Sequence, residues 1–154
     1  MAIQFALIDN KDTTTSLAFF NSKNVKRENI FHVSHLQELC ARMGTGDTVW
    51  CADVDRFGSV SAFYSFIQLA SNRGTNFRAL ANSYLNFGSG KALKPSIVIF
   101  VQYLATMENK LITDILSMGQ NGNRMIVSGY CGALFVDILG QTFASDSIMK
   151  RSSQ

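Results

Sequence analysis

Two short apolar runs that end abruptly in acidic residues constrain this chain most. Ile3–Ile8 is apolar, partly β-branched and stopped by Asp9, and Thr48–Ala52 leads directly into the charged segment Asp53–Gly58. Runs of this length and composition predict buried strands. Open α/β sheets place their sites beyond the carboxyl ends of such strands, so we expect a site where the second run ends.

Helical patterns separate these runs and predict the fold class. Apolar residues recur at helical spacing over His35–Met43 and Ser61–Asn72, and Asn76–Leu80 has the composition of a third short strand. The segment 11–16 is polar and predicts a loop. Strands alternating with helices predict an α/β domain with a mainly parallel sheet of four or five strands and helices on both faces.

A long helix is predicted over residues 95–118, with Pro95 just inside its start and Gly119 as its stop. At 1.5 Å per residue it is roughly 35 Å long. Its apolar residues alternate in steps of four and three, as in a coiled-coil seam: Ile97, Val101, Leu104, Glu108, Leu111, Ile115 and Met118. A second apolar side predicts contact with a partner subunit, and the alternative is a helix buried within its own domain.

Glu108 is the exception on that seam. A buried carboxylate must be hydrogen-bonded, paired with a cation or protonated. A single polar residue on a helix seam also serves to fix register, so a functional role and a structural role both remain open.

Composition narrows the function classes. The chain has 154 residues, 47% of them hydrophobic, and a formal charge of +3 with scattered basic residues, which permits a polyanionic partner. Three widely spaced cysteines make no zinc pattern, so we expect no metal and no cofactor. No apolar run approaches the roughly 20 residues of a membrane span, and we expect a cytoplasmic protein.

Four segments in order resemble the serine recombinases, the family of resolvases and invertases. Gly46–Gly58 resembles the pattern "GD-x-hydrophobic run-LDRLGR", and Asn76–Leu80 resembles "V-x-F-x-S-L". Leu104–Ile112 is similar to the dimer-helix pattern "LAEFERELI", and Gly119 falls on the family's glycine after that helix. The resemblance covers about residues 1–120 and implies a resolvase-like three-layer domain over 1–119 with a long C-terminal dimerisation helix. Residues 120–154 form a short extension without a clear helix-turn-helix domain.

The resemblance implies a chemistry in which a serine attacks a DNA phosphodiester among several arginines. Asp55, Arg56 and Glu108 match the family's site positions. Asp9 occupies the nucleophile position. Family arginines are replaced at four further positions, namely Leu7, Val33, Ser59 and Asn109. Loss of one charge-stabilising donor typically lowers a rate about 10²–10³-fold, so we expect strand exchange to be lost.

We therefore expect a recombinase-like protein of a mobile element or DNA recombination system, without catalytic activity. It would act as a homo-oligomer through the 95–118 helix, or by assembly with DNA or an active recombinase. Two alternatives stay open. One is an active strand-exchange enzyme with a nucleophile relocated to the hydroxyls of residues 13–16, and the other is an unrelated α/β oligomerisation module.

Overall fold

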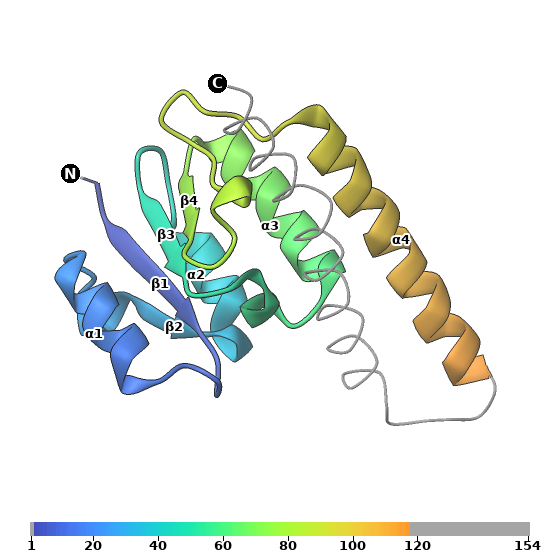
Figure 1. Cartoon of the computed structure of the whole chain (residues 1–154), viewed down its shortest axis with the longest axis horizontal. Coiled ribbons are helices and arrows are strands. Elements are labelled where there is room, and N and C mark those ends of the chain that lie inside the picture. The colour runs from blue at the N-terminus through green and yellow to red at the C-terminus, as the bar shows by residue number, and fades with distance from the viewer. Residues whose placement is uncertain (1, 118–154) are drawn as a thin grey trace, which may run out of the picture. The chain divides into compact units, whose positions relative to one another are not determined.

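The computed structural model of the chain describes residues 2–117 (Figure 1). In the described residues four strands alternate with helices. The connections include four short 3₁₀ turns: η1 (Arg27–Asn29), η2 (Val33–His35), η3 (Val54–Phe57) and η4 (Ser83–Leu85). In chain order the main elements are β1 (Gln4–Ile8), α1 (Thr14–Ser22), β2 (Ile30–His32), α2 (Leu36–Arg42), β3 (Thr48–Cys51), α3 (Val60–Arg73), β4 (Asn76–Ala79) and α4 (Pro95–Ser117). The predicted α/β class is confirmed.

All four strands of the sheet run parallel, in the order β2-β1-β3-β4. Ala6 of β1 pairs with Ile30 on one side and with Trp50 on the other, and Trp50 pairs in turn with Arg78 of β4. The chain therefore extends the sheet in opposite directions from β1 and from β3. Sites of open α/β sheets form at such a reversal, beyond the carboxyl ends of the two strands.

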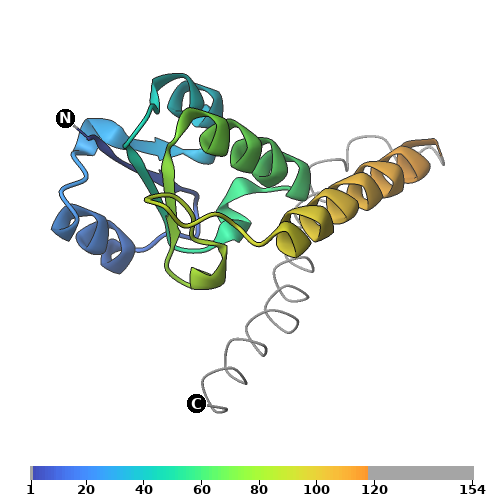
Figure 2. The same cartoon turned by 90° about the horizontal axis from the view of Figure 1, so that it is seen from above.

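Helices cover both faces of the sheet, as predicted. The side chains of successive strand residues point to opposite faces, and both faces of β1 are apolar. On one face Ala6 packs with Phe20 of α1 and with Val25. On the other face Phe5 lies 6.2 Å from Phe31 between ring centroids. Figure 2 shows α1 on one side of the sheet and α2 with α3 on the other. A sheet buried on both faces explains why the strands read as continuous apolar runs.

The chain divides into two compact units. The first comprises Met1–Arg56 and Ser65–Leu93, and so contains the sheet, α1, α2 and the second half of α3. The described part of the second unit consists of residues 57–64 and 94–117. It contains the whole described helix α4 and the first turn of α3. The predicted domain end at residue 119 and the extension 120–154 lie outside the described residues.

Helix α4 runs unbroken from Pro95 to Ser117, as predicted for this part of the 95–118 helix. Its buried face differs from the predicted seam: Ala105 and Ile112 are buried, whereas Leu104 is half-buried and Leu111 is 44% exposed. The buried residues step by four, four, three and four, which is the spacing of a straight α-helix face and not of a heptad seam.

Two elements have no counterpart in the sequence prediction. The segment expected to be a loop over 11–16 instead leads into α1 at Thr14. The first residues of α1 are threonine and serine, which are weak helix formers, and only Phe20 of this helix is buried. Strand β2 has three residues, too few to show an alternating pattern.

Candidate functional site

The turn after β1 brings two aspartates together at the carboxyl edge of the sheet. The Asp9 backbone N–H donates to Asp12 Oδ2 over 2.9 Å, and Asp9 Oδ1 accepts from the Lys11 N–H over 2.7 Å. Aspartate suits this position because its short side chain bonds to backbone N–H groups of the same turn. The turn holds Asp12 with its side chain only 1% exposed.

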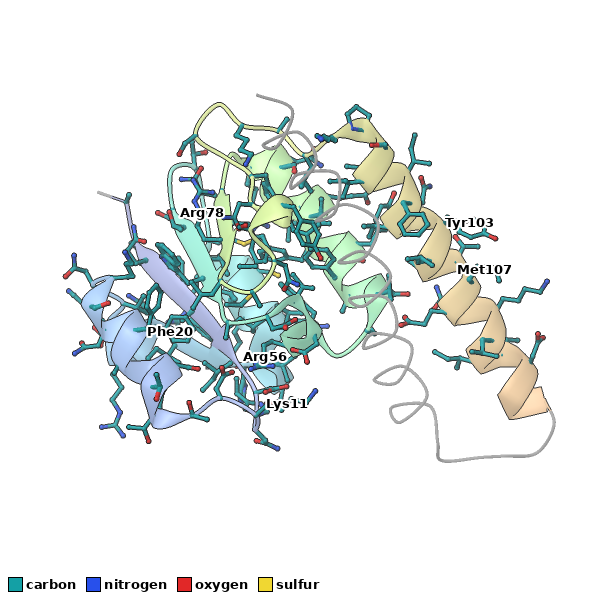
Figure 3. All side chains as sticks on the ribbon, viewed as in Figure 1. Lys11, Phe20, Arg56, Arg78, Tyr103 and Met107 are labelled. Atoms are coloured by element: carbon teal, nitrogen blue, oxygen red, sulfur yellow. The ribbon has the colours of Figure 1, made fainter. Side chains whose placement is uncertain are left out.

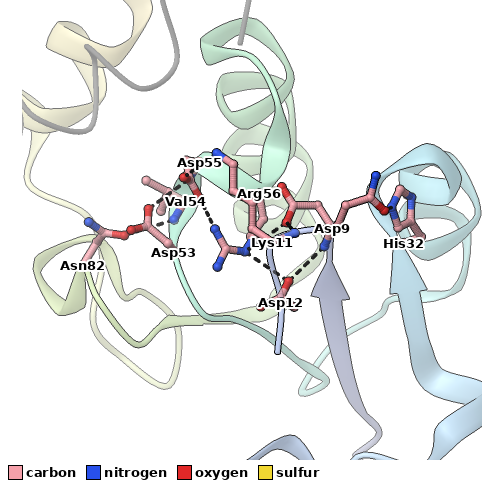
Figure 4. A network of polar contacts seen from close by, with 10 residues as sticks. Asp9, Lys11, Asp12, His32, Asp53, Val54, Asp55, Arg56 and Asn82 are labelled. Atoms are coloured by element: carbon pink, nitrogen blue, oxygen red, sulfur yellow. Dashed lines mark hydrogen bonds and ion pairs between the residues drawn. The ribbon is translucent and has the colours of Figure 1, made fainter. Parts of the chain in front are cut away.

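Arg56, in the turn η3 (Val54–Phe57) after β3, is the centre of this edge (Figure 4). Its Nε lies 3.0 Å from Asp12 Oδ2 and 3.4 Å from Asp9 Oδ1, and its Nη1 lies 2.5 Å from Asp55 Oδ1. Lys11 Nζ lies 3.1 Å from the other Asp55 oxygen. The structure thus brings Asp9, Asp55 and Arg56 together, at the reversal between β1 and β3. We call Asp9, Lys11, Asp12, Asp53, Asp55 and Arg56 the acidic corner.

The acidic corner has more carboxylates than cations. Asp53 is tied to it, since its Oδ1 accepts from the Asp55 N–H over 3.0 Å. Four carboxylates face Lys11 and Arg56, so the formal charge is −2. Asp12 Oδ1 is buried and has no hydrogen-bond partner among residues 2–117.

The titration of two groups reflects this crowding. Burial raises the pKa of Asp53 above its ordinary value, and the negative charge of Asp55 acts in the same direction. Burial lowers the pKa of Arg56, but the hydrogen bond to Asp12 and the charges of Asp12, Asp55 and Asp9 outweigh it, so the net pKa is raised. Arg56 therefore stays charged as the internal counter-ion of the corner.

The end of β2 adds a polar chain but no metal site. His32 Nε2 lies 3.1 Å from Asn10 Oδ1, and His32 Nδ1 accepts from the Ser34 N–H over 3.2 Å. Val33, where the family has an arginine, begins the turn η2 (Val33–His35). Within residues 2–117, no group of three or more His, Cys, Asp or Glu side chains is placed to hold a metal ion.

Glu108 lies in the second unit and caps a helix. Its side chain is buried, and Oε2 accepts from the Val60 N–H over 2.9 Å while Oε1 accepts from the Ser61 N–H over 3.2 Å. These are the first two N–H groups of α3, which have no partner within their own helix. A carboxylate at a helix N-terminus is also favoured by the helix dipole. The structure thus gives Glu108 a helix-capping contact.

Ser59 and Asn109, at which the resemblance implies arginine, lie beside the same cap. Ser59 Oγ accepts from the Ala62 N–H over 3.0 Å, which satisfies the third N–H of α3. Asn109 Oδ1 lies 3.2 Å from Ser61 Oγ. Uncharged side chains therefore do here what an arginine could not, since an arginine has no acceptor atom.

Leu7 belongs to the core. Its side chain is fully buried in β1, where it pairs with Phe31 and Cys51. A guanidinium at this position would be placed among apolar side chains, at a high desolvation cost.

Sequence reasoning did not identify Asp12 or Lys11 as members of the site. Both lie in the segment expected to be a loop. Asp12 joins the site because the turn folds back so that its side chain accepts a hydrogen bond from the Asp9 N–H, which the sequence pattern does not predict. The available signal was an acidic residue shortly after the carboxyl end of a strand.

Helix α4 presents a second candidate surface. Four large apolar side chains, spaced every four residues, are exposed on it: Ile99 at 65%, Tyr103 at 59%, Met107 at 46% and Leu111 at 44%. Tyr103 and Met107 are labelled on this helix in Figure 3. We call these four residues the α4 stripe. Contiguous exposed apolar residues of this kind mark interaction sites.

Comparisons with known proteins add no family. No family model matches the chain, and no curated protein matches it. In the part of the chain that the structure describes, no helix has the length and apolar character needed to cross a membrane.

Proposed function

We propose that this chain is a serine recombinase-like protein of a mobile element or DNA recombination system that does not cut DNA and acts by assembly. The observation that carries the proposal is the position of Asp9, 3.4 Å from Arg56 at the carboxyl ends of β1 and β3. The resemblance puts the nucleophile at this residue. The resolvase-like architecture and the cytoplasmic setting are parts of the same proposal.

Electrostatics argue against cleavage at this corner. At an effective dielectric constant of 20, two unit charges 4 Å apart interact by about 4 kcal/mol, and here a phosphate would meet a net negative site. Arg56, the cation nearest to Asp9, is already bonded to carboxylates. If Asp9 did attack a phosphodiester, the product would be an acyl phosphate, which hydrolyses readily and is not kept for religation.

Assembly is the role that the α4 stripe supports. In water, four exposed apolar side chains on one helix gain free energy when a second helix covers them. A second copy of the chain and the matching helix of an active recombinase are both candidate partners. A general α/β oligomerisation module would use the same stripe, so the two hypotheses differ in the partner and not in the surface.

Light scattering coupled to size exclusion tests assembly. We expect the wild-type chain to form dimers or tetramers, and Tyr103→Ser with Met107→Ser to be monomeric. The control replaces exposed α4 residues outside the stripe, with Gln102→Ala and Thr106→Ala, and should assemble like the wild type. A monomeric wild type that also ignores an added active recombinase would remove the proposal.

Suicide DNA substrates separate the inactive protein from an active enzyme. We expect no covalent protein–DNA adduct from the wild-type chain at stoichiometric concentration. Adducts that disappear on substitution of Thr13, Thr14, Thr15 or Ser16 would instead establish a relocated nucleophile. Asp9→Ser is the restoration variant to use, because Leu7→Arg would disrupt the core.

A further inference from the structure

The two edges of the sheet carry opposite charge. In a parallel sheet every connection into a strand lies at the amino edge, and here these connections are basic. The cations at this edge are Lys23, Lys26, Arg27, Arg42, Arg73 and Lys91. All belong to the first unit, and all except Arg73 are exposed. The carboxyl edge holds the acidic corner, with its formal charge of −2.

Lys91 reaches the amino edge through a loop that folds back on β4. Gly88 and Lys91 exchange backbone hydrogen bonds of 2.7 and 3.1 Å, and Ser89 Oγ lies 3.2 Å from the side chain of Asn76, the first residue of β4. In Figure 1 this loop and the connections that precede β2, β3 and β4 follow the same edge, opposite the ends of the strand arrows.

These charges are not neutralised internally. Among residues 2–117 none of the six cations forms an ion pair with a carboxylate. Two acidic residues lie in the described connections at this edge. Asp47 is buried, and its carboxylate oxygens accept hydrogen bonds from the N–H groups of Ile3 and Gly44, both at 2.9 Å. Glu28 is the other acid in the described connections into β2, β3 and β4, and it is exposed. Arg73 donates to the carbonyl oxygens of Cys40 and Met43 and keeps its charge.

We propose that the amino edge of the sheet is a binding surface for the phosphate backbone of duplex DNA. The edge spans three strand spacings of about 4.8 Å, or roughly 14 Å. A duplex carries one charge per roughly 1.7 Å with both strands counted, so the length of duplex along this edge carries about eight phosphates, and those on the near side face the cations. Proteins that bind single strands add aromatic rings as stacking platforms. Here the nearby rings of Phe19 and Trp50 pack edge to face, with Lys23 Nζ above both.

The polarity of the unit fixes its orientation on DNA. A duplex would attract the amino edge and repel the acidic corner, so the corner would face away from the bound duplex. The proposed function includes assembly with DNA, and the amino edge is where this chain would contact the DNA. The inference depends on the placement of charges at the amino edge and not on the α4 stripe.

Fluorescence anisotropy with a labelled duplex of about 30 base pairs tests the surface, at salt from 50 to 200 mM. If each of the five exposed cations neutralises one phosphate, the slope of log affinity against log salt is about −4.5. Lys26→Glu with Arg27→Glu should reduce the slope by about 2 and lower the affinity at least tenfold at low salt. The control, Lys110→Glu with Gln102→Glu and Thr106→Glu, changes the net charge equally at exposed positions of α4 and should keep the wild-type salt slope.

Each other result overturns the inference. No duplex binding by the wild type, equal loss in the two charge-reversal variants, or no loss in the first would exclude the amino edge. Binding to phosphatidylserine vesicles without binding to the duplex would assign the edge to a membrane surface. The monomeric Tyr103→Ser, Met107→Ser variant should keep the wild-type salt slope, so failed assembly and failed DNA binding are distinguishable.

Discussion

Replacing Glu108 by alanine tests whether this carboxylate is a helix cap or a member of a reactive site. The substitution removes the acceptors of two backbone donors, the buried Val60 N–H and the partly buried Ser61 N–H, at 2.9 and 3.2 Å. A hydrogen bond to a charged group contributes about 1.5–3 kcal/mol, and loss of a helix cap typically costs about 1 kcal/mol. Relief of the buried charge offsets part of this loss. We expect the free energy of unfolding to fall by about 2–4 kcal/mol.

Chemical denaturation and amide exchange measure this effect together. For a chain of this size a loss of that magnitude lowers the melting temperature by roughly 4–16 °C. Hydrogen exchange should accelerate first at the amides of Val60 and Ser61. Glu108→Gln keeps one acceptor oxygen and should lose about half as much. The control Gln102→Ala, at an exposed position of the same helix, should change stability by less than about 0.5 kcal/mol.

The double variant with Ser59→Ala gives the sharper result. Ser59 and Glu108 cap the same helix turn, so their effects should be non-additive. If Glu108→Ala left both stability and the exchange of these amides within error of the wild type, the cap would be excluded, and a role in assembly or chemistry would have to explain the buried carboxylate.

Three further predictions concern the first unit. Arg56→Met removes the counter-ion of Asp12, whose side chain is 1% exposed. The free energy of unfolding, measured with denaturant, should fall by about 3 kcal/mol. A fall below about 0.5 kcal/mol would contradict the internal ion pair. Burial raises the pKa of Asp53 in the folded state, so the ionised carboxylate destabilises the fold at pH values above that pKa. Asp53→Asn should therefore have a higher melting temperature than the wild type at pH 7. This difference in melting temperature should vanish near pH 3, where the carboxyl is protonated in both the folded and the unfolded chain. A gap that widens on acidification would refute this. Burial also raises the pKa of Cys51 well above its ordinary value, so iodoacetamide should modify Cys51 only on unfolding and reach the half-buried Cys40 earlier, as read by mass spectrometry.

The sequence was sufficient to predict the elements that have strong local patterns. Strands β1 and β3 follow from apolar runs, because burial on both faces of a sheet leaves a continuous apolar segment. Helix α3 and the described length of α4 follow from helical spacing, because burial of one helix face leaves a periodic pattern. Strand β2 and helix α1 leave no such trace. Strand β2 is held by its pairing with β1, and α1 by the burial of one aromatic ring, both of which are tertiary effects.

The candidate site was only partly predictable for the same reason. That Asp9 and Arg56 meet follows from two strand ends at one edge of a parallel sheet. That Asp12 completes the cluster depends on a turn whose side-chain hydrogen bonds have no periodic signature. The cap formed by Glu108 joins residues separated by 48 positions, and no local pattern relates them.

The acidic corner and the basic edge are linked by the construction of the sheet. In a parallel sheet all segments that follow a strand lie at the carboxyl edge, and all segments that precede a strand lie at the amino edge. The acidic residues after β1 and β3 therefore share one edge, and the basic residues before β2, β3 and β4 share the other. The overall formal charge of +3 is therefore the sum over two edges that carry charge of opposite sign and over the rest of the chain. At the corner, Arg56 and Lys11 offset part of the repulsion among the four carboxylates within the same edge. The amino edge has no such internal partner among the described residues, and an external anion is what its charge distribution would favour.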